Sequence, residues 1–395
     1  MRTLAFLISL LVANLVFGQV AGGGNSCAAI LLPGATVAPL VGEFTKIFGK
    51  LDSKAGVIKE SHGVVAVGLL KSSHQKAEYS TLLLFDSFTG LKMFTAPHHV
   101  EEIRSMEFTT DGKYLITSSR DGYIRILDID RQSIKAEIPS NNIGRIASKG
   151  PTLTIAADKY LIIGDGNEIQ IVNLSSGSSA GKVIFETSTF VGRVQVESLA
   201  VSAGAFPDVV KVAVAFNTPS GGMVRWFNLG RLMQKKIIDL SKELEGARTK
   251  ERKTEVAKNS FLNIGTKFLS VNGGVSAGQI VVDPAGNYFV VAGSDGSVVT
   301  ESMNGTLAPK IPNNQYFTAR LAISRDGRFL VTGSPSIDKV LRVIDLENGN
   351  IFERELPQRI YAVSFLNNDR SLLIQTSPDS GTPNEMLRLE YPWFD

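Results

Sequence analysis

The chain has 395 residues, of which 43% are hydrophobic, and it carries a formal net charge of +3 at pH 7. Its single cysteine, Cys27, excludes an intramolecular disulfide, so the fold must be stabilised by its core, which a chain of this length can supply. The weak net charge neither requires nor excludes an anionic partner surface.

The N-terminal residues have the pattern of a secretory signal peptide. Arg2 supplies one positive charge, an apolar run extends from Leu4 to Phe17, and Gly18 provides a small residue near the expected cleavage site. A membrane anchor would need about 20 apolar residues, and this run is shorter. We therefore expect residues 1–18 to be a signal peptide and the mature protein to be periplasmic or extracellular, with no transmembrane segment.

The segment after the signal peptide is glycine-rich. We expect residues 19–27 to be a flexible linker, in which Cys27 is an incidental residue; a reactive or cross-linking thiol is the alternative. Ala28–Leu32 is apolar and compatible with a strand, but it has no partner strand within its own segment. Val41–Leu51 places apolar residues at helical spacing, which predicts a short helix.

A unit of four short strands joined by tight turns is clearest between Ser105 and Ile138. Alternating apolar residues and glycine-containing turns indicate antiparallel strands, and such a unit has the form of one propeller blade. Because one blade cannot bury both of its apolar faces alone, neighbouring units have to pack against it. The turn residues Gly112, Gly122 and Gly296 are expected at positive φ.

The unit recurs along the chain. At the end of each third strand an apolar residue, or a threonine in one case, precedes an acid or its amide. These seven blade anchors are Asp86, Asp128, Asn173, Asn228, Glu301, Asp345 and Glu390. Most of their spacings match the roughly 40 to 45 residues of a propeller blade, and two longer spacings indicate insertions.

These features resemble WD-repeat propellers and the related repeats that read DGKYLYVTN. The resemblance rests on Asp111–Ser118, Asp326–Gly333 and the anchors, and it covers roughly residues 58–395. It implies an all-β, seven-bladed β-propeller of four-stranded antiparallel blades that is a monomeric ring. The chain departs from the family pattern, because no blade has a Gly-His pair before its first strand and no anchor dipeptide contains Trp. The family's hydrogen-bond network, which uses that His and Trp, is therefore not expected.

The last repeat ends too close to Asp395 to provide a fourth strand. An open blade edge is a liability, so we expect the N-terminal segment near residues 28–32 to supply the closing strand. Residues 28–395 would then form one domain.

Two motifs that could bind ligands are better explained as loops. His98 and His99 are adjacent, so their side chains point apart, and no third ligand is nearby; a surface loop is favoured over a metal site. Leu161–Asn167 is glycine-containing but precedes a strand, Glu168–Asn173, rather than a helix, which favours a hairpin turn over a phosphate-binding loop. No cofactor or metal is expected.

The longest interval between anchors contains a charged segment. After Gln234–Leu240, which is compatible with the outer strand of blade four, Ser241–Lys258 carries mixed charges and apolar residues at helical spacing. We expect a short charged helix there that docks a partner; a solvated helix without a specific role is the alternative. The candidate docking residues are Lys242, Arg248, Lys250, Arg252 and Lys253. The mixed charges disfavour nucleic acid as the partner.

The sequence favours a non-catalytic scaffold that binds a protein or peptide, because no nucleophile, base and orienting group come together in it. The alternatives are a propeller enzyme, such as a lactonase-like hydrolase or a quinone-dependent dehydrogenase, and a propeller that binds a small molecule or glycan. An enzyme would place charged side chains and a histidine around the central channel. The charged residues of the predicted first strands are Arg104, Glu107, Glu197 and Arg320.

Overall fold

The computed structural model describes most of the chain from residue 36 to residue 390. The described residues are 36–41, 44–51, 55–69, 82–96, 99–140, 150–186, 194–218, 221–239, 265–269, 275–304, 311, 320–335, 339–366, 369, 371–377 and 384–390. The chain divides into two compact units, Met1–Ile30 and Leu31–Asp395, and every described residue belongs to the second.

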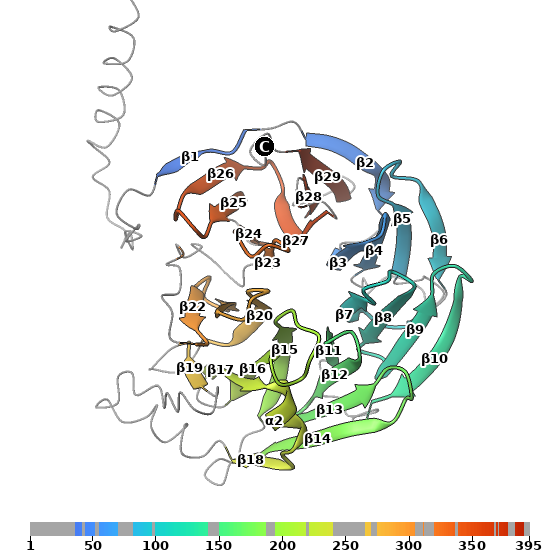
Figure 1. Ribbon diagram of the computed structural model, residues 1–395. Coiled ribbons are helices and arrows are strands. Elements are labelled where there is room, and N and C mark those ends of the chain that lie inside the picture. Colours follow the sequence, from blue (N-terminus) through green and yellow to red (C-terminus); the bar gives the residue numbers. More distant parts are fainter. Residues whose placement is uncertain are drawn as a thin grey trace, which may run out of the picture. The chain divides into compact units, whose positions relative to one another are not determined.

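Seven separate β-sheets surround a central channel in the second unit, as the blades of a propeller do (Figure 1). Blade one consists of β3 (Ala55–Ser61), β4 (Val64–Leu69), β5 (Leu82–Asp86) and β6 (Lys92–Ala96). Blade two consists of β7 (Ile103–Phe108), β8 (Tyr114–Ser119), β9 (Tyr123–Asp128) and β10 (Ser133–Pro139). Blade three contains β11 (Thr152–Ala156), β12 (Tyr160–Asp165), β13 (Glu168–Asn173) and β14 (Ser179–Glu186).

The second half of the ring repeats this arrangement. Blade four contains β15 (Gln195–Val201), β16 (Lys211–Thr218), β17 (Gly221–Asn228) and β19 (Gly265–Phe268). The described strands of blade five are β20 (Ala277–Val282), β21 (Tyr288–Gly293) and β22 (Val298–Ser302). Blade six contains β23 (Arg320–Ile323), β24 (Phe329–Gly333), β25 (Val340–Asp345) and β26 (Ile351–Glu355). Blade seven contains β27 (Arg359–Phe365), β28 (Ser371–Ser377), β29 (Asn384–Glu390) and β2 (Phe44–Leu51). The predicted all-β, seven-bladed fold is therefore confirmed.

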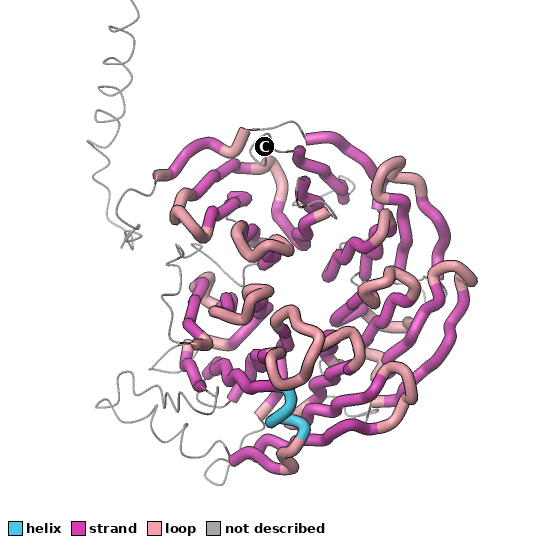
Figure 2. The backbone as a smooth tube through the Cα atoms, in the orientation of Figure 1, coloured by secondary structure: helices cyan, strands magenta, loops and turns pink. Residues whose placement is uncertain are grey.

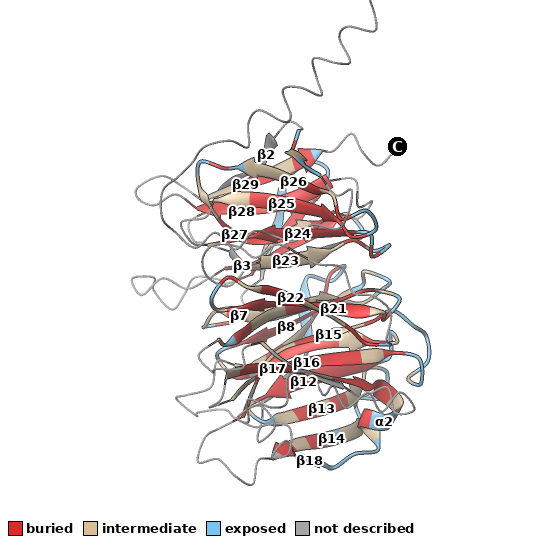
Figure 3. Ribbon diagram, turned by 90° about the vertical axis from the view of Figure 1, so that its left-hand side faces the viewer, coloured by how far each residue is buried: buried red, intermediate tan, exposed pale blue. Residues whose placement is uncertain are grey.

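The core consists of the contacts between blades. The buried apolar residues form seven clusters, and each cluster combines side chains of two neighbouring blades. Second strands such as β12, β21 and β24 consist of buried residues only, because neighbouring blades cover both faces of the blade to which each belongs (Figure 3). No blade has a core of its own, which is why the repeat must be stacked into a ring.

The tight turns have the backbone conformation that their glycines predict. Gly112, Gly122 and Gly296 have φ angles of 68°, 83° and 88°, which confirms the expected positive values. Gly112 also lies against the preceding blade, because a Cβ atom built on it would lie 2.5 Å from Nδ1 of His62. This glycine is needed both for its conformation and for the close approach of two blades.

The ring is closed by β2, which pairs antiparallel with β29 as the outer strand of blade seven. An N-terminal segment thus forms the outer strand of blade seven, and this segment is β2. Residues 28–32, to which the prediction gave this role, lie outside the described residues. The helix predicted at residues 41–51 was wrong. The hydrogen-bonding edge of β29 holds this apolar segment in an extended conformation.

Two further strands lie parallel to the outer edges of blades. β1 (Val37–Pro39) pairs with β26 of blade six, and β18 (Ile237–Asp239) pairs with β14 of blade three. The segment expected to be the outer strand of blade four therefore extends blade three, and β19 takes the expected place.

The described residues contain one short helix, α2 (Leu229–Met233), among the many strands (Figure 2). Its N-cap is Asn228, whose side chain accepts a hydrogen bond from the backbone N–H of Arg231. The charged helix expected at residues 241–258 lies outside the described residues, as does the expected signal peptide. No helix in the described part of the chain is long and apolar enough to cross a membrane.

Candidate functional site

The central channel has a volume of about 1160 Å³ and is lined by the first strands of all seven blades. The four charged residues that the sequence placed on first strands all line it: Arg104, Glu107, Glu197 and Arg320. Two of them reach the channel from bulges, because Arg104 and Glu197 lie where β7 and β15 shift register against their second strands. A bulge redirects a side chain in this way.

Most of these charges form pairs across blade boundaries. Nζ of Lys59 lies 2.7 Å from Oε1 of Glu107, and Nη2 of Arg104 lies 3.3 Å from Oε1 of Glu197. The second carboxylate oxygen of Glu197 accepts a hydrogen bond from Nδ2 of Asn217 at 3.0 Å. Burial lowers the pKa of Arg320, and the positive charge of Arg104 lowers it further.

Neither of the two described histidines, His62 and His99, lines the channel. His99 is instead buried, with 2% of its surface exposed, so the prediction of a surface loop was wrong for this residue. The charged side chains thus converge as an enzyme would require, but no described histidine accompanies them.

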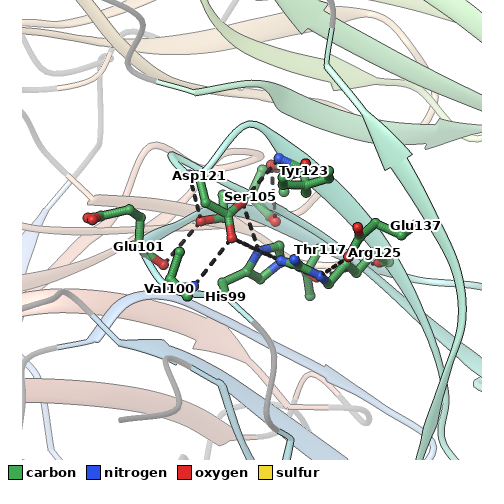
Figure 4. A network of polar contacts seen from close by, with 11 residues as sticks. His99, Val100, Glu101, Ser105, Thr117, Asp121, Tyr123, Arg125 and Glu137 are labelled. Carbon is green, nitrogen blue, oxygen red and sulfur yellow. Dashed lines mark hydrogen bonds and ion pairs between the residues drawn. The ribbon is translucent and has the colours of Figure 1, made fainter. Parts of the chain in front are cut away.

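His99 belongs to a polar network within blade two (Figure 4). Its Nδ1 lies 3.0 Å from Oδ2 of Asp121, and its Nε2 lies 2.9 Å from Oγ1 of Thr117. Nδ1 also lies 2.5 Å from Nη1 of Arg125. Because a carboxylate only accepts and a guanidinium only donates, these two contacts of Nδ1 favour opposite tautomers of the ring. Arg125 extends the network, since its Nη1 lies 2.9 Å from Oδ2 of Asp121 and its Nε lies 2.6 Å from Oε2 of Glu137.

The charge states of this network follow from burial and from these bonds. Burial lowers the pKa of His99, and the hydrogen bond to Asp121 only partly opposes this shift. Burial alone would raise the pKa of Asp121, but the contacts with His99 and Arg125 outweigh it and lower the pKa below its ordinary value. At neutral pH the network therefore contains a neutral imidazole and an ionised carboxylate.

The order Thr117, His99, Asp121 has the connectivity of a nucleophile, a base and an orienting acid. Thr117 is 0% exposed and His99 is 2% exposed, so no substrate can reach the hydroxyl. The network instead holds together the connection from blade one, the strand β8 and the turn before β9. The family's network of a histidine and a tryptophan was not expected in this chain; the network found here combines a histidine with an arginine.

The sequence model of the WD domain, G-beta repeat, matches residues 90–128. This match runs from the turn before β6 to the last residue of β9, so it spans the outer strand of blade one and the three inner strands of blade two, and it includes the histidine network. The seven-bladed ring agrees with it. The chain is a WD-repeat β-propeller. No curated protein matches its sequence.

In this WD-repeat β-propeller, five of the seven predicted blade anchors end a third strand and accept hydrogen bonds from the residues that follow. These five are Asp86, Asp128, Asn173, Asn228 and Asp345. In blade six the residue after the anchor, Leu346, donates its backbone N–H to the carbonyl of Arg328. The equivalent hydrogen bond in blade five runs from Met303 to Asn287. The anchor of blade five is therefore the residue before Met303, which is Ser302 rather than the predicted Glu301. Glu390 ends β29 and pairs with Arg388.

The turn after the third strand has one backbone conformation in blades one, three and six. The N–H of the glycine four residues after the anchor donates to the carbonyl of the anchor: Gly90 to Asp86, Gly177 to Asn173 and Gly349 to Asp345, at 2.9, 2.8 and 2.7 Å. All three glycines have positive φ. The repeat thus supplies three copies of the same turn for comparison.

Blade one differs from the other two copies in its exposed side chains. Phe88 and Leu91 are 76% and 69% exposed, whereas the equivalent positions hold Ser175 and Ser178 in blade three. In blade six they hold Glu347 and Asn350. Since the same turn forms with polar residues at both positions, the fold does not require Phe88 or Leu91 to be apolar. The sequence interpretation missed this pair, although an alignment of the turns on the anchors would have shown it.

A second exposed apolar pair lies in blade four. Phe206 and Val209 are 70% and 60% exposed in the connection between β15 and β16. In a propeller, connections between first and second strands emerge on the same ring face as those between third and fourth strands. Both pairs therefore belong to one face, in separate blades. The predicted docking residues Lys242, Arg248, Lys250, Arg252 and Lys253 lie outside the described residues.

Proposed function

We propose that this WD-repeat β-propeller is a non-catalytic scaffold that binds a protein partner through the turn of residues 86–91 in blade one. The observation that carries the proposal is the exposure of Phe88 and Leu91 on a turn whose copies are polar. Large apolar side chains on a rigid scaffold are typical anchors of protein interfaces. The WD-repeat fold supports a binding role in general.

The turn is held in place before any partner arrives. The Asp86 carboxylate accepts hydrogen bonds from the backbone N–H groups of Phe88 and Thr89 at 3.1 and 2.7 Å. A preformed turn loses little conformational entropy on binding, so most of the apolar contact area contributes to affinity. The partner is expected to offer an apolar pocket that receives the phenyl ring.

The test replaces both side chains with those of a polar copy of the turn, in the double variant Phe88→Glu with Leu91→Asn. A pull-down with the mature protein from its own source should then lose the partner that the wild type recovers, while the melting temperature stays within a few degrees. The double variant Phe206→Ser with Val209→Ser is the matched control on the same face. Recovery of the same partner by the blade-one variant would refute this surface.

Residues 241–258 are a second candidate docking element, because they lie outside the repeat period and combine basic and acidic residues. In the same pull-down, a variant in which a Gly/Ser linker replaces residues 241–258 shows which of the two surfaces binds the partner. If this variant loses the partner and the blade-one variant keeps it, the charged segment is the docking element.

We also propose that the protein is exported, so that the partner is a periplasmic or extracellular protein. The apolar run from Leu4 to Phe17 after one basic residue supports this. N-terminal sequencing of the mature protein is expected to begin near Gln19, and an intact Met1 in the mature protein would contradict export.

A further inference from the structure

Arg320 is the first residue of β23 and is held rigidly at the channel wall. The side chain of Gln279, from blade five, forms two hydrogen bonds with the backbone of the next residue, Leu321: Nε2 donates to the carbonyl at 2.8 Å, and Oε1 accepts from the N–H at 3.1 Å. Blade five thereby fixes the strand from which the arginine projects. Arg320 is one of the residues that line the channel.

The positive charge of Arg320 is not neutralised by any described side chain. No hydrogen bond or ion pair of its guanidinium is found among the described residues, and its Nε is buried without a hydrogen-bond partner. The charged residue with the largest effect on the pKa of Arg320 is Arg104, another cation, which lowers it. Buried charges are normally paired, so an arginine in this setting is unusual.

The neighbouring carboxylate is already engaged. Oε1 of Glu197 pairs with Arg104 and its Oε2 accepts a hydrogen bond from Asn217, and no described hydrogen bond or ion pair joins Glu197 to Arg320. The Nε of Arg104 is, like that of Arg320, buried without a hydrogen-bond partner. Among the described residues, five basic and four acidic side chains line the channel, so its lining has an excess of one positive charge: Lys59, Arg104, Arg320, Arg325 and Arg359 against Glu60, Glu107, Glu197 and Asp369.

We propose that the channel contains an oxyanion site in which Arg320, assisted by Arg104, binds the carboxylate or phosphate group of a small solute. The planar guanidinium fork matches both groups through two parallel hydrogen bonds. Desolvation in the channel strengthens such a contact relative to the same contact in bulk water. This site is separate from the protein-docking turn of blade one and does not depend on it.

The test is calorimetric titration of the full mature chain with inorganic phosphate and, separately, with acetate, at constant ionic strength set with sodium chloride. Saturable binding of at least one of the two anions is expected for the wild type, and the anion that binds identifies the ligand group. Arg320→Gln should weaken that binding about tenfold or more. Arg325→Gln, which removes a charge from an exposed arginine of the same channel, should leave it nearly unchanged.

A third variant covers the case in which Arg320→Gln does not fold. Arg320→Lys keeps the charge but loses the fork, so it should also bind the anion several-fold more weakly. The proposal is overturned if neither anion binds to the wild type, or if the folded Arg320 variants bind as the wild type does. An equal loss in Arg325→Gln would also overturn it, because binding would then reflect only the overall charge of the channel.

Discussion

His99 connects three parts of blade two through the two nitrogens of one ring. Its partners are a strand residue, Thr117, and a turn residue, Asp121, which also accepts hydrogen bonds from the backbone N–H groups of Val100 and Tyr123. Buried polar groups that satisfy one another in this way hold a single arrangement, because each broken bond leaves a buried donor or acceptor unpaired. The stability of blade two should therefore depend on the charge state of the ring.

We predict that His99 makes the protein less stable in mild acid. Its pKa in the folded chain is lowered from the ordinary value of 6.5, so the unfolded chain takes up this proton first as the pH falls. The free energy of unfolding should decrease as the pH drops below about 6.5, until the lowered pKa of the folded state is reached. His99→Gln should cost about 1 to 3 kcal/mol near neutral pH and reduce this dependence.

Urea unfolding at a series of pH values between about 7.5 and 5 measures the effect. His62→Asn serves as the control, because His62 is exposed and has a φ of 51°, which asparagine tolerates. If His99→Gln keeps the full pH dependence of the wild type, the titration belongs to another group.

The turn glycines give a second prediction at this scale, based on a matched pair. Gly112 and Gly177 have nearly the same φ, 68° and 66°. A Cβ atom added to Gly112 would clash with His62, whereas a Cβ atom added to Gly177 would have no other atom within 4 Å. Gly177→Ala should cost about 1 kcal/mol for its backbone conformation, and Gly112→Ala should cost measurably more. Chemical denaturation of the two variants compares them; equal losses would show that the contact between blades one and two is unimportant.

Some of these residues could be predicted from the sequence and others could not. The glycines could, because a tight hairpin turn requires positive φ within a few residues of local sequence. His99 could not, because its role depends on Thr117 and Asp121 lying beside it in space, and the residue before it is His98 rather than the glycine of the family pattern. The pairing of Arg104 with Glu197 was equally inaccessible, since it depends on bulges in two different blades.

At the scale of single elements, the N-terminal strands show how tertiary context overrides local pattern. The apolar spacing of residues 41–51 fits a helix, but β29 offers an unpaired edge, and pairing with it satisfies the backbone of both strands. β1 lies along blade six, and Leu40 after it is 3% exposed in the cluster between blades six and seven. Both strands thus belong to the fold.

We predict a stepwise loss of stability when these strands are removed. Relative to a chain that begins at Thr36, a chain that begins at residue 42 loses β1 and the buried Leu40, which should cost about 2 kcal/mol or more. A chain that begins at residue 52 also loses β2 and should unfold or aggregate, because the edge of β29 becomes exposed.

Thermal unfolding and size-exclusion chromatography of the three chains test this order. If the chain that begins at residue 52 remains monomeric with the same melting temperature as the reference, β2 does not close the ring in solution.

For the whole molecule, the number of blades could be predicted because the same pattern recurs at every interface between blades. Each of the seven apolar clusters joins two blades, so one periodic signal specifies the entire core. The features that break the period could not be predicted in the same way. β18 is an example: it follows blade four in the sequence but pairs with blade three, and only the geometry of the outer edges decides between these positions.

The pairing of β2 with β29 can form only late in the synthesis of the chain. Phe44 is among the first residues of the ring to be made, yet its partner, Leu389, is among the last. Ribosomes add about 5 to 20 residues per second, so β2 must wait roughly 20 to 70 s for the strand that it joins. During that interval both ends of the nascent ring are open, and their strand edges are exposed to pairing with other chains.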